Sequence, residues 1–412
     1  MKIKEIAEFN PSPLMPIPGR AEIDYIDTAS VTEGVLHNIQ NLNEKFPSRA
    51  QREVVANDIL ISSVRPNLKH NYLVKTVNNG MIASSGFIHI RINPKANISP
   101  NFLYYYLTNP AKVNYYTKIA ECSQSAYPSF NKDVIEEIEF PNIDLPTQLR
   151  IAGILGSLDE KIALNRKKIA ELEALAKTIY DYWFVQFDFP DKNGKPYKSS
   201  GGKMVWNEAL KREIPEGWEA KSLGTIESNI ITGKTPSTAD ETNFGGEIPF
   251  LTIDDLRGHV YAYSSQRSLS KRGALLQKGK FIAPDSLCVS CIGTVGVISF
   301  CALSSQTNQQ INTVVFTNDY NREYLYFALK SYFSAATVKT GNTFVNMSKC
   351  EFAAIQCLLP PRSMRVKFHS IMRSVFMQIK NAEKQIISQT KARDTLLPLL
   401  MNGQVKVRVK LK

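Results

Sequence analysis

Apolar residues recur at alternating steps of three and four through the middle of the chain, which is the spacing of a heptad repeat. The residues on these steps are Leu155, Leu158, Ile162, Asn165, Ile169, Leu172, Ala176, Ile179 and Trp183. A 3.5-residue period is typical of a helix that packs along a partner helix, and a single polar member such as Asn165 fixes the register of the pair. We therefore predict a spacer helix from Thr147 to Trp183, about 55 Å long at 1.5 Å per residue.

A second and weaker seam begins at Met372, which corresponds to Leu155 in the first seam. Its members are Met372, Val375, Ile379, Ala382, Ile386, Gln389, Arg393, Leu396 and Leu400. Two matched seams in one chain favour helices that pair with each other as a coiled coil. The alternatives are a coil between two molecules and two amphipathic helices that each pack on their own domain.

The two seams are part of a longer internal repeat, in which each half runs through the same elements in the same order. These are a strand opened by an Asp turn, a short apolar helix, a polar turn and a strand that ends at proline. The matching pairs are 57–63 with 284–290, 98–107 with 321–329, 130–133 with 347–350, and 138–141 with 357–360. We predict an α+β fold in the order globular domain, helix, globular domain, helix.

The domain boundaries are expected where the pattern changes. The two globular domains are placed at 1–145 and 214–362, and the two spacer helices at 146–187 and 363–403. A polar Pro/Gly/Ser linker is expected at 188–213. A basic strand of alternating residues is expected at 404–412, with a solvated basic tail as the alternative.

A stretch without charge, from Ser286 to Asn318, contains the most apolar run of the second half. A membrane-spanning helix needs about 20 apolar residues in helix-compatible order. Here Gly293–Gly296 separates two β-branched, Cys-rich pieces, Leu287–Cys291 and Val297–Cys301. The run therefore predicts the two strands of a buried hairpin and no membrane span.

The six cysteines are scattered and mostly flanked by apolar residues. The first residues, Met1–Glu5, have no apolar core, so we expect no secretion signal and a cytoplasmic protein with reduced, buried thiols. Cys288 and Cys291 have the spacing of half a zinc site, but no second pair follows. Two cysteines of one strand are therefore favoured over a metal site.

The charge balance adds a candidate partner to this picture. Lys and Arg number 50 against 38 Asp and Glu, giving a net charge of +12 over 412 residues. An excess of this sign suits nucleic acid before a membrane surface. Gly233-Lys234-Thr235 is the nearest approach to a P-loop, but the earlier glycine is missing and Pro236 blocks the following helix. The sequence favours binding without a cofactor. A nuclease or methyltransferase fused to its DNA reader is the enzymatic alternative, and a structural coiled-coil protein with no DNA role is the other.

Loops that adjoin apolar strands gather side chains suited to DNA contact, since Arg and Lys pair with guanine and Asn and Gln with adenine. The predicted DNA-contacting residues are Arg49, Arg52, Arg65, Asn67, Lys69, His70, Lys132, Lys234, Thr235, Lys271, Arg272, Asn308, Gln309 and Lys349. Lys132 and Lys349 occupy equivalent places in the repeat and are expected to contact phosphate. For each residue the alternative is a solvated loop charge or a turn cap.

Two groups of aromatic residues have different expected roles. Tyr104–Tyr106 and Tyr115–Tyr116 lie on short apolar helices, where core packing is favoured over stacking on bases. Tyr180, Tyr182, Trp183 and Phe184 stand beside the linker at the end of the first seam. For these four we favour a partner-docking patch over burial against the chain's own domain.

Nine short segments identify a family when they are taken together and in order. They are 46–50, 58–68, 145–148 and 154–162 in the first half, and 214–218, 232–237, 248–252, 293–296 and 308–310 in the second. They span almost the whole chain, which resembles the specificity subunits of type I restriction–modification systems. The second helix departs from the pattern, because Pro360–Arg365 lacks the glutamine found at Gln148.

The resemblance implies two mixed α/β target-recognition domains in a pseudo-twofold repeat, separated by an antiparallel coiled coil. Each domain would read one half of a split, asymmetric site in double-stranded DNA. The subunit would have no catalytic activity of its own. It would recruit methyltransferase subunits, expected to number two, which bind S-adenosylmethionine, and restriction subunits through them. An orphan or exchangeable subunit that serves another system's enzyme is the alternative.

Overall fold

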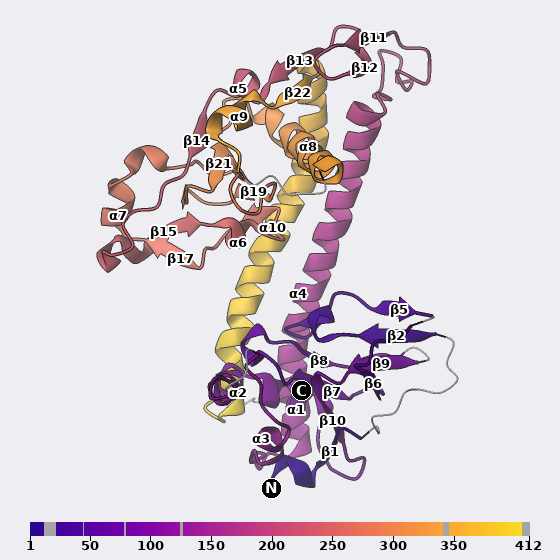
Figure 1. Cartoon of the computed structure of the whole chain (residues 1–412), viewed down its shortest axis with the longest axis vertical. Helices are drawn as coiled ribbons and strands as arrows, with labels where there is room; N and C mark the ends of the chain where they lie inside the picture. The colour runs from indigo at the N-terminus through magenta and orange to yellow at the C-terminus, as the bar shows by residue number, and fades with distance from the viewer. Residues whose placement is uncertain (12–21, 44, 78–79, 124–126, 341–345, 406–412) are drawn as a thin grey trace, which may run out of the picture. The chain divides into compact units, whose positions relative to one another are not determined.

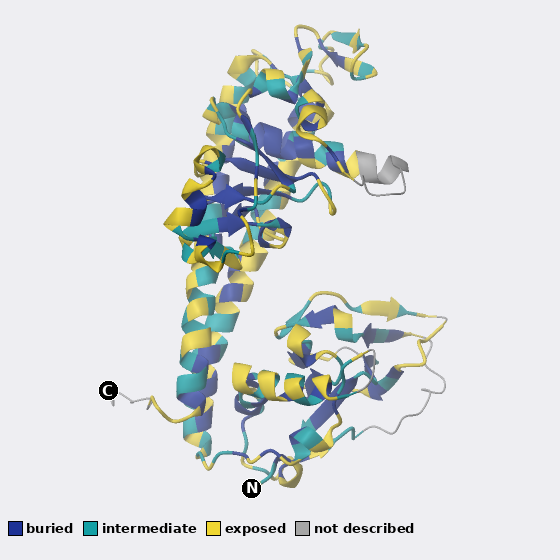
Figure 2. Ribbon diagram, turned by 60° about the vertical axis from the view of Figure 1, so that its left-hand side comes forward, coloured by how far each residue is buried: buried dark blue, intermediate teal, exposed yellow. Residues whose placement is uncertain are grey.

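The computed structural model describes residues 1–11, 22–43, 45–77, 80–123, 127–340 and 346–405, which form two compact units (Figure 1). Unit 1 consists of Met1–Lys161 together with Gln389–Lys412, and unit 2 of Ile162–Ser388. Figure 2 shows the buried residues concentrated in the sheets of each unit. None of the helices within the described ranges has the length and hydropathy that a bilayer span requires.

The described residues of unit 1 form two four-stranded sheets and a short ladder. The first sheet is antiparallel, in the order β1 (Ala7–Phe9), β10 (Phe87–Ile92), β7 (Ile59–Ser62) and β8 (Asn71–Leu73). The second has the order β5 (Gln40–Leu42), β2 (Ile23–Ile26), β9 (Met81–Ser84) and β6 (Ala50–Glu53), with β2 and β9 parallel. The ladder joins β3 (Val31–Thr32) to β4 (Val35–Leu36).

The short helices of unit 1 begin at residues that can satisfy their free N–H groups. Ser99 accepts a hydrogen bond from the Phe102 amide at the start of α1, and Pro100 takes the first helical position. The helical elements are η1 (Ile3–Glu5), η2 (Thr28–Ser30), η3 (Pro66–Leu68), α1 (Pro100–Thr108), α2 (Pro110–Glu121) and α3 (Asp133–Glu136). Tyr104, Tyr105 and Tyr116 are buried, which confirms the predicted core packing at these positions, whereas Tyr115 is 47% exposed and the prediction is wrong there.

In unit 2 the residues that the structure describes form one five-stranded sheet, one three-stranded sheet and two pairs of strands. The large sheet has the order β14 (Ile230–Thr232), β21 (Ile311–Val314), β18 (Leu287–Ser290), β19 (Ile298–Cys301) and β16 (Tyr261–Ala262). The smaller sheets are β17 (Arg267–Leu269), β15 (Phe244–Leu251) and β20 (Gln306–Thr307), then β11 (Met204–Asn207) with β12 (Arg212–Pro215), and β13 (Glu219–Ser222) with β22 (Gln356–Leu359). Its shorter helical elements are η4 (Asp181–Val185), α5 (Leu223–Ile226), η5 (Glu241–Asn243), α6 (Ile253–Leu256), α7 (Lys271–Leu275), η6 (Lys278–Lys280), η7 (Asp319–Asn321), α8 (Arg322–Thr340) and α9 (Lys349–Ala354).

The predicted hairpin in the charge-free stretch is confirmed. β18 and β19 pair antiparallel, and all their residues are buried. The segment predicted as a linker carries a hairpin of its own, formed by β11 and β12. Cys122 and Cys350 are exposed, so the expectation of buried thiols is wrong for these two, whereas burial raises the pKa of Cys291 to about 11. The predicted terminal strand falls almost wholly on 406–412, outside the described residues.

Two long helices carry the two seams, α4 (Leu145–Tyr180) and α10 (Arg362–Met401). In unit 1 the Asp159 carboxylate of α4 lies 3.0 Å from Arg393 of α10, and in unit 2 the later Trp183 ring packs on the earlier Phe368. Residue numbers increase from Asp159 to Trp183 along the first segment, whereas those of the contacted residues decrease from Arg393 to Phe368. The two helices therefore pair antiparallel. Every seam residue predicted for either helix is buried or half-buried, so the coiled coil is confirmed.

The missing glutamine of the second helix has a substitute in the structure. Gln148 donates to the Ile143 carbonyl at 2.8 Å, and its other amide atom accepts from the Ser99 amide of α1. Arg365, at the equivalent place in the second half, donates from Nε to the Pro360 carbonyl at 3.0 Å and from Nη1 to the Asn321 side-chain oxygen. Both side chains tie the start of a long helix to the start of a shorter one. The substitution therefore preserves the local structure.

The aromatic residues at the end of α4 are mostly core residues. Tyr180, Trp183 and Phe184 are buried, and the Phe184 ring meets Tyr324 edge-on with 4.9 Å between centroids. Burial of large rings against the helices of unit 2 removes them from any surface. The predicted docking patch is therefore wrong for these three residues, and Tyr182 alone of the four is exposed, at 41%.

Candidate nucleic-acid interface

The predicted DNA-contacting residues of unit 1 fall on a strand, a strained turn and a polar loop. Arg49 is exposed immediately before β6, whereas Arg52 within β6 is only 8% exposed. The pairing of β6 with β9 shifts register between Ala50 and Arg52. A bulge of this kind re-aims the side chains that follow it.

The turn after β7 holds Arg65 and Lys69 in left-handed conformations, with φ of 47° and 53°. Residues with a Cβ occupy this region at a cost, so the surrounding structure has to maintain it. Three backbone hydrogen bonds within the turn and one from the Arg65 amide to the Pro128 carbonyl do so. Asn67 at its centre is exposed, and the Arg65 guanidinium lies over the Tyr127 ring at 5.2 Å. The turn thus presents Arg65 and Asn67 outward from a fixed backbone.

Other predicted contacts of unit 1 already have partners within the chain. The Lys69 ammonium lies 2.6 Å from the Glu33 carboxylate, and His70 Nδ1 lies 2.6 Å from the Val31 carbonyl. Lys132 pairs with Glu136 one helical turn away. These exposed ion pairs are weak, so Lys69 and Lys132 can exchange them for phosphate at little cost.

Unit 2 brings two of its predicted clusters together. The Lys234 amide donates to the Thr307 carbonyl at 3.0 Å, and the Thr235 hydroxyl donates to the Gln309 side chain at 2.6 Å. A Cβ on Gly233 would lie 2.1 Å from the Asn308 carbonyl oxygen, so only glycine permits this approach. Two loops that are distant in the sequence therefore form one polar surface.

The remaining predicted residues of unit 2 lie on short helices. Lys271 and Arg272 open α7, where Ser270 caps the helix by accepting from the Gly273 amide at 3.0 Å. Arg272 lies 3.1 Å from Asp240, the residue that also caps η5. Lys349 opens α9 and is exposed. These cations are accessible and only loosely held.

Unit 1 also contains a buried polar network that the sequence did not predict. Asp58 is 1% exposed and accepts hydrogen bonds from His89 Nε2 at 2.6 Å and from Arg91 at 2.7 and 2.9 Å. Burial alone would raise the pKa of Asp58, but the bonds from Arg91 and His89 outweigh it and lower that pKa. The network fixes β7 against β10. A histidine in the middle of an apolar strand was its only signal in the sequence.

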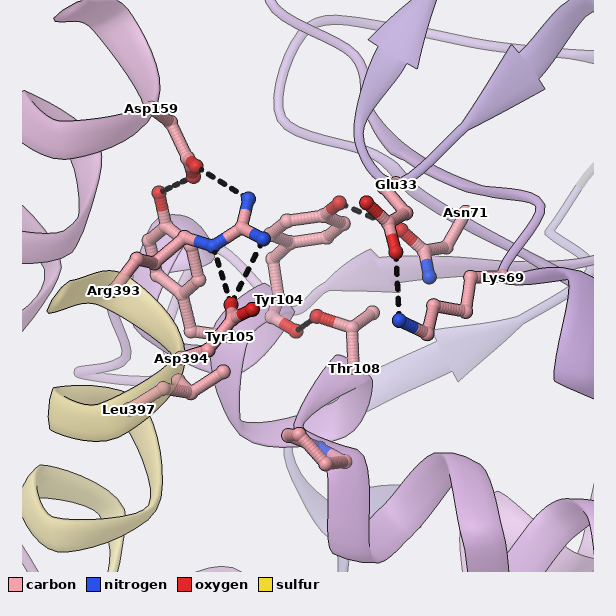
Figure 3. A pocket seen from close by; sticks show the side chains of 11 residues that line it. Glu33, Lys69, Asn71, Tyr104, Tyr105, Thr108, Asp159, Arg393, Asp394 and Leu397 are labelled. Carbon is pink, nitrogen blue, oxygen red and sulfur yellow. Dashed lines mark hydrogen bonds and ion pairs between the residues drawn. The ribbon is translucent and has the colours of Figure 1, made fainter. Parts of the chain in front are cut away.

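Figure 3 shows a second polar cluster in unit 1, where residues of α1, α4 and α10 meet. Arg393 and the Tyr105 hydroxyl both contact the Asp159 carboxylate, at 3.0 and 2.6 Å. On the far side the Tyr104 hydroxyl donates to Asn71 at 2.7 Å. Burial by itself lowers the pKa of Arg393, but its bond to Asp159 gives a net rise. The cavity between these side chains is only about 60 Å³, so it offers little room for a ligand. The polar cluster therefore anchors the helices.

Unit 2 has comparable anchors on the same two helices. The buried Glu383 of α10 accepts from His259 Nδ1 at 3.0 Å and from the Val260 amide at 3.2 Å. Glu173 of α4 accepts from the Tyr326 hydroxyl of α8 at 2.6 Å. No group of three or more His, Cys, Asp or Glu residues suited to holding a metal ion occurs in the described part of the chain.

The chain is similar to known proteins in sequence and in fold. The family model of the type I restriction modification DNA specificity domain matches residues 1–174 and 215–390. The chain is 28% identical to the type I restriction enzyme HindI specificity subunit of Haemophilus influenzae, over 92% of this chain and 94% of that protein. It is 24% identical to the MjaIX specificity subunit of Methanocaldococcus jannaschii, over 89% and 82%. The solved type I restriction-modification S subunit from M. genitalium matches in fold, with a TM-score of 0.56, 15% identity and coverage of 97% and 95%.

Proposed function

The chain belongs to the type I restriction–modification DNA specificity family, and on this premise we propose that it reads a split, asymmetric site in double-stranded DNA. Each half of the chain carries one match to the family model. We infer that each globular domain reads one half-site and that the paired helices set the gap between them. The domain boundaries we propose are 1–145 and 214–362, with the helices at 146–187 and 363–403.

The observation that carries the residue-level proposal is the convergence of two loops in unit 2. Thr235 and Gln309 are joined by a hydrogen bond, and Lys234 is exposed beside them. Gln and Asn match the donor and acceptor pattern of adenine in the major groove, and Lys matches guanine. We propose that Lys234, Asn308 and Gln309 read the second half-site from this surface.

For the first half-site we propose readout by the strained turn after β7. Arg65 and Asn67 are exposed on a backbone that is held by four hydrogen bonds. A side chain on a rigid turn loses less conformational entropy on binding than one on a loose loop. Arg49, Lys132, Lys271, Arg272 and Lys349 are proposed phosphate contacts, which position the protein and supply affinity.

The chain is proposed to supply recognition while partner subunits supply catalysis. We infer that two methyltransferase subunits dock on it, one for each copy of the repeat, and that restriction subunits join through them. Such an assembly acts on DNA in the cytoplasm. Of the predicted aromatic docking residues only Tyr182 is retained in this proposal, because it is exposed.

The test is to express the chain with a methyltransferase subunit and to sequence the modified bases in host DNA. The expected result is one bipartite motif with a fixed gap. Four residues inserted at Ala170 extend the helix by about 6 Å and should lengthen the gap without changing the bases read. Gln309→Ala should relax the second half-site alone, and Asn67→Ala the first. An undivided motif, or methylation of DNA by the purified chain alone, would refute the proposal.

A further inference from the structure

Arg52 is a buried arginine without a partner in the described residues. Its side chain belongs to β6 and is 8% exposed, and its Nε is buried without a hydrogen bond. Neither a carboxylate nor an aromatic ring within the described ranges pairs with its guanidinium. Buried arginines are ordinarily paired, because a charge removed from water loses its hydration without compensation.

An arginine cannot avoid this free-energy cost by losing its proton. Burial lowers the pKa of Arg52, but a guanidinium still keeps its proton at neutral pH. Ala50 and Arg52 stand two residues apart in β6 and are both buried, as expected for side chains on one face of a strand. The strand thus holds a permanent cation that forms no ion pair with a carboxylate of the described residues.

Arg52 lines a surface hollow of about 310 Å³, whose other polar residues are mostly hydrogen-bond donors. The polar lining consists of Asn10, Arg52, Ser63, Ser85, Asn131, Lys132 and Asp133. Asn10 uses its amide oxygen to accept from the His89 amide, which leaves its N–H groups for another acceptor. The one carboxylate of this lining, on Asp133, is 72% exposed and lies 3.8 Å from Lys132. The positive charge of Arg52 and the hydrogen-bond donors of the lining therefore both favour a ligand with anionic oxygens.

We propose that this hollow is a phosphate site, in which Arg52 and Lys132 hold one phosphate of the DNA backbone. The inference rests on the proposed DNA-reading function and deepens it. A backbone phosphate projects from the duplex and can enter a hollow, whereas a base edge has to be reached by a side chain that extends into a groove. The Arg52 side chain is buried within β6 and does not project far enough to reach into a groove. It therefore fixes the position of the first domain on DNA without reading sequence.

The experiment compares the full-length wild-type chain with Arg52→Met, which keeps much of the length of the side chain and removes the charge. Lys95→Met, at an exposed lysine of the same unit, is the matched control. Affinity for cognate and random duplexes is measured from about 50 to about 200 mM salt. Loss of one phosphate contact lowers the slope of log K against log salt by about 0.9, a change of about 3.5-fold in the affinity ratio across this range. We expect that loss for Arg52→Met on both duplexes, and a smaller one for Lys95→Met.

A second arm needs no DNA. Inorganic phosphate should raise the unfolding temperature of the wild-type chain more than that of Arg52→Met, because a ligand stabilises the state that binds it. Equal shifts would overturn the phosphate site. Protection by free phosphate with an unchanged DNA slope would assign the site to a free anion and overturn the DNA contact. A wild-type chain that binds no duplex would refute the proposed function and leave the phosphate shift intact, so the two failures are distinguishable.

An altered preference at one base position in Arg52→Met would also overturn the proposal, because it would make Arg52 a base reader. The variant Arg52→Lys keeps the charge without the planar fork. It should retain the salt slope of the wild type. A slope as low as that of Arg52→Met would show that charge is not what the site supplies.

Discussion

The ion pair between Arg393 and Asp159 gives a sharp test of how the helices are anchored in unit 1. Arg393 stands at a seam position that is ordinarily apolar, and its side chain is 17% exposed, against 32% for Asp159. Breaking a fully buried pair costs about 3–5 kcal/mol, and an exposed pair contributes about 0–1 kcal/mol. The intermediate exposure places the loss in Arg393→Met at about 2 kcal/mol. For a unit of this size that is a fall in melting temperature of about 4–8 °C.

The assay can separate the units, because all three tryptophans, Trp183, Trp206 and Trp218, lie in unit 2. Unfolding followed by far-ultraviolet circular dichroism reports both units, whereas tryptophan fluorescence reports unit 2. We expect Arg393→Met to lower the stability of unit 1 and to leave the fluorescence transition in place. The exposed pair of Lys167 and Glu171 on the same helix as Asp159 is the control, with an expected loss of under about 0.5 kcal/mol.

A double-mutant cycle with Asp159→Asn completes the test. The two single losses should exceed the loss in the double variant by about 1–2 kcal/mol in sum, because the double variant leaves no unpaired charge. A coupling energy within about 0.3 kcal/mol of zero would refute the argument that Asp159 is what makes Arg393 acceptable in the seam. An equal fall in the fluorescence transition would refute its assignment to unit 1.

Three further predictions concern unit 2. Trp183→Ala should destabilise the unit by about 3–5 kcal/mol in denaturant titration, whereas Tyr182→Ala should change stability by less than about 0.5 kcal/mol; the reverse order would restore the docking patch. The bond to Glu383 raises the pKa of His259 above its ordinary 6.5, although burial and Arg166 oppose this and Asp255 adds to it. Because the pKa of His259 is higher in the folded state, the protonated side chain stabilises the fold below about pH 6.5, and this contribution is lost as the pH rises through the pKa of the folded state. The free energy of unfolding of the wild type should therefore fall over this pH window more than that of His259→Gln. Parallel pH profiles of the two proteins would contradict this. Gly233→Ala should cost about 1–3 kcal/mol and weaken recognition of the second half-site, since its Cβ would meet backbone oxygens; unchanged unfolding and methylation profiles would speak against the close approach.

The features that the sequence predicted correctly are those with a clear local pattern. The 3.5-residue seams and the two short apolar runs on either side of Gly293–Gly296 each indicate their structure within a few residues. Arg393 weakened the second seam as a pattern, because its partner Asp159 belongs to the other half of the chain. Arg365 likewise looked like a departure from Gln148, and only the three-dimensional contacts show that it makes an equivalent bond.

Contacts between distant segments also explain why the predicted aromatic docking patch was wrong for Tyr180, Trp183 and Phe184. Phe184 and its neighbours meet Tyr324 from a remote part of the sequence, and no local pattern announces a core that is assembled from such separated pieces. Arg52 was predicted as a DNA contact from its charge alone. Its burial depends on the pairing of β6 with the distant β9, which the residue types of β6 alone do not reveal. Whether a given loop residue reads a base stays a prediction.

The split composition of unit 1 has a consequence for how the chain acquires its structure during synthesis. Leu397 and Leu400 of α10 belong to the same core as Leu155 and Phe102, so the segment Met1–Lys161 has an open apolar face until the last helix has been made. Unit 2 is one continuous stretch and can complete its core while translation continues. The domain translated first is thus the one finished last. Chaperones that cover apolar surface would have their longest engagement with the N-terminal half, and truncation before Gln389 should leave unit 1, rather than unit 2, prone to aggregate.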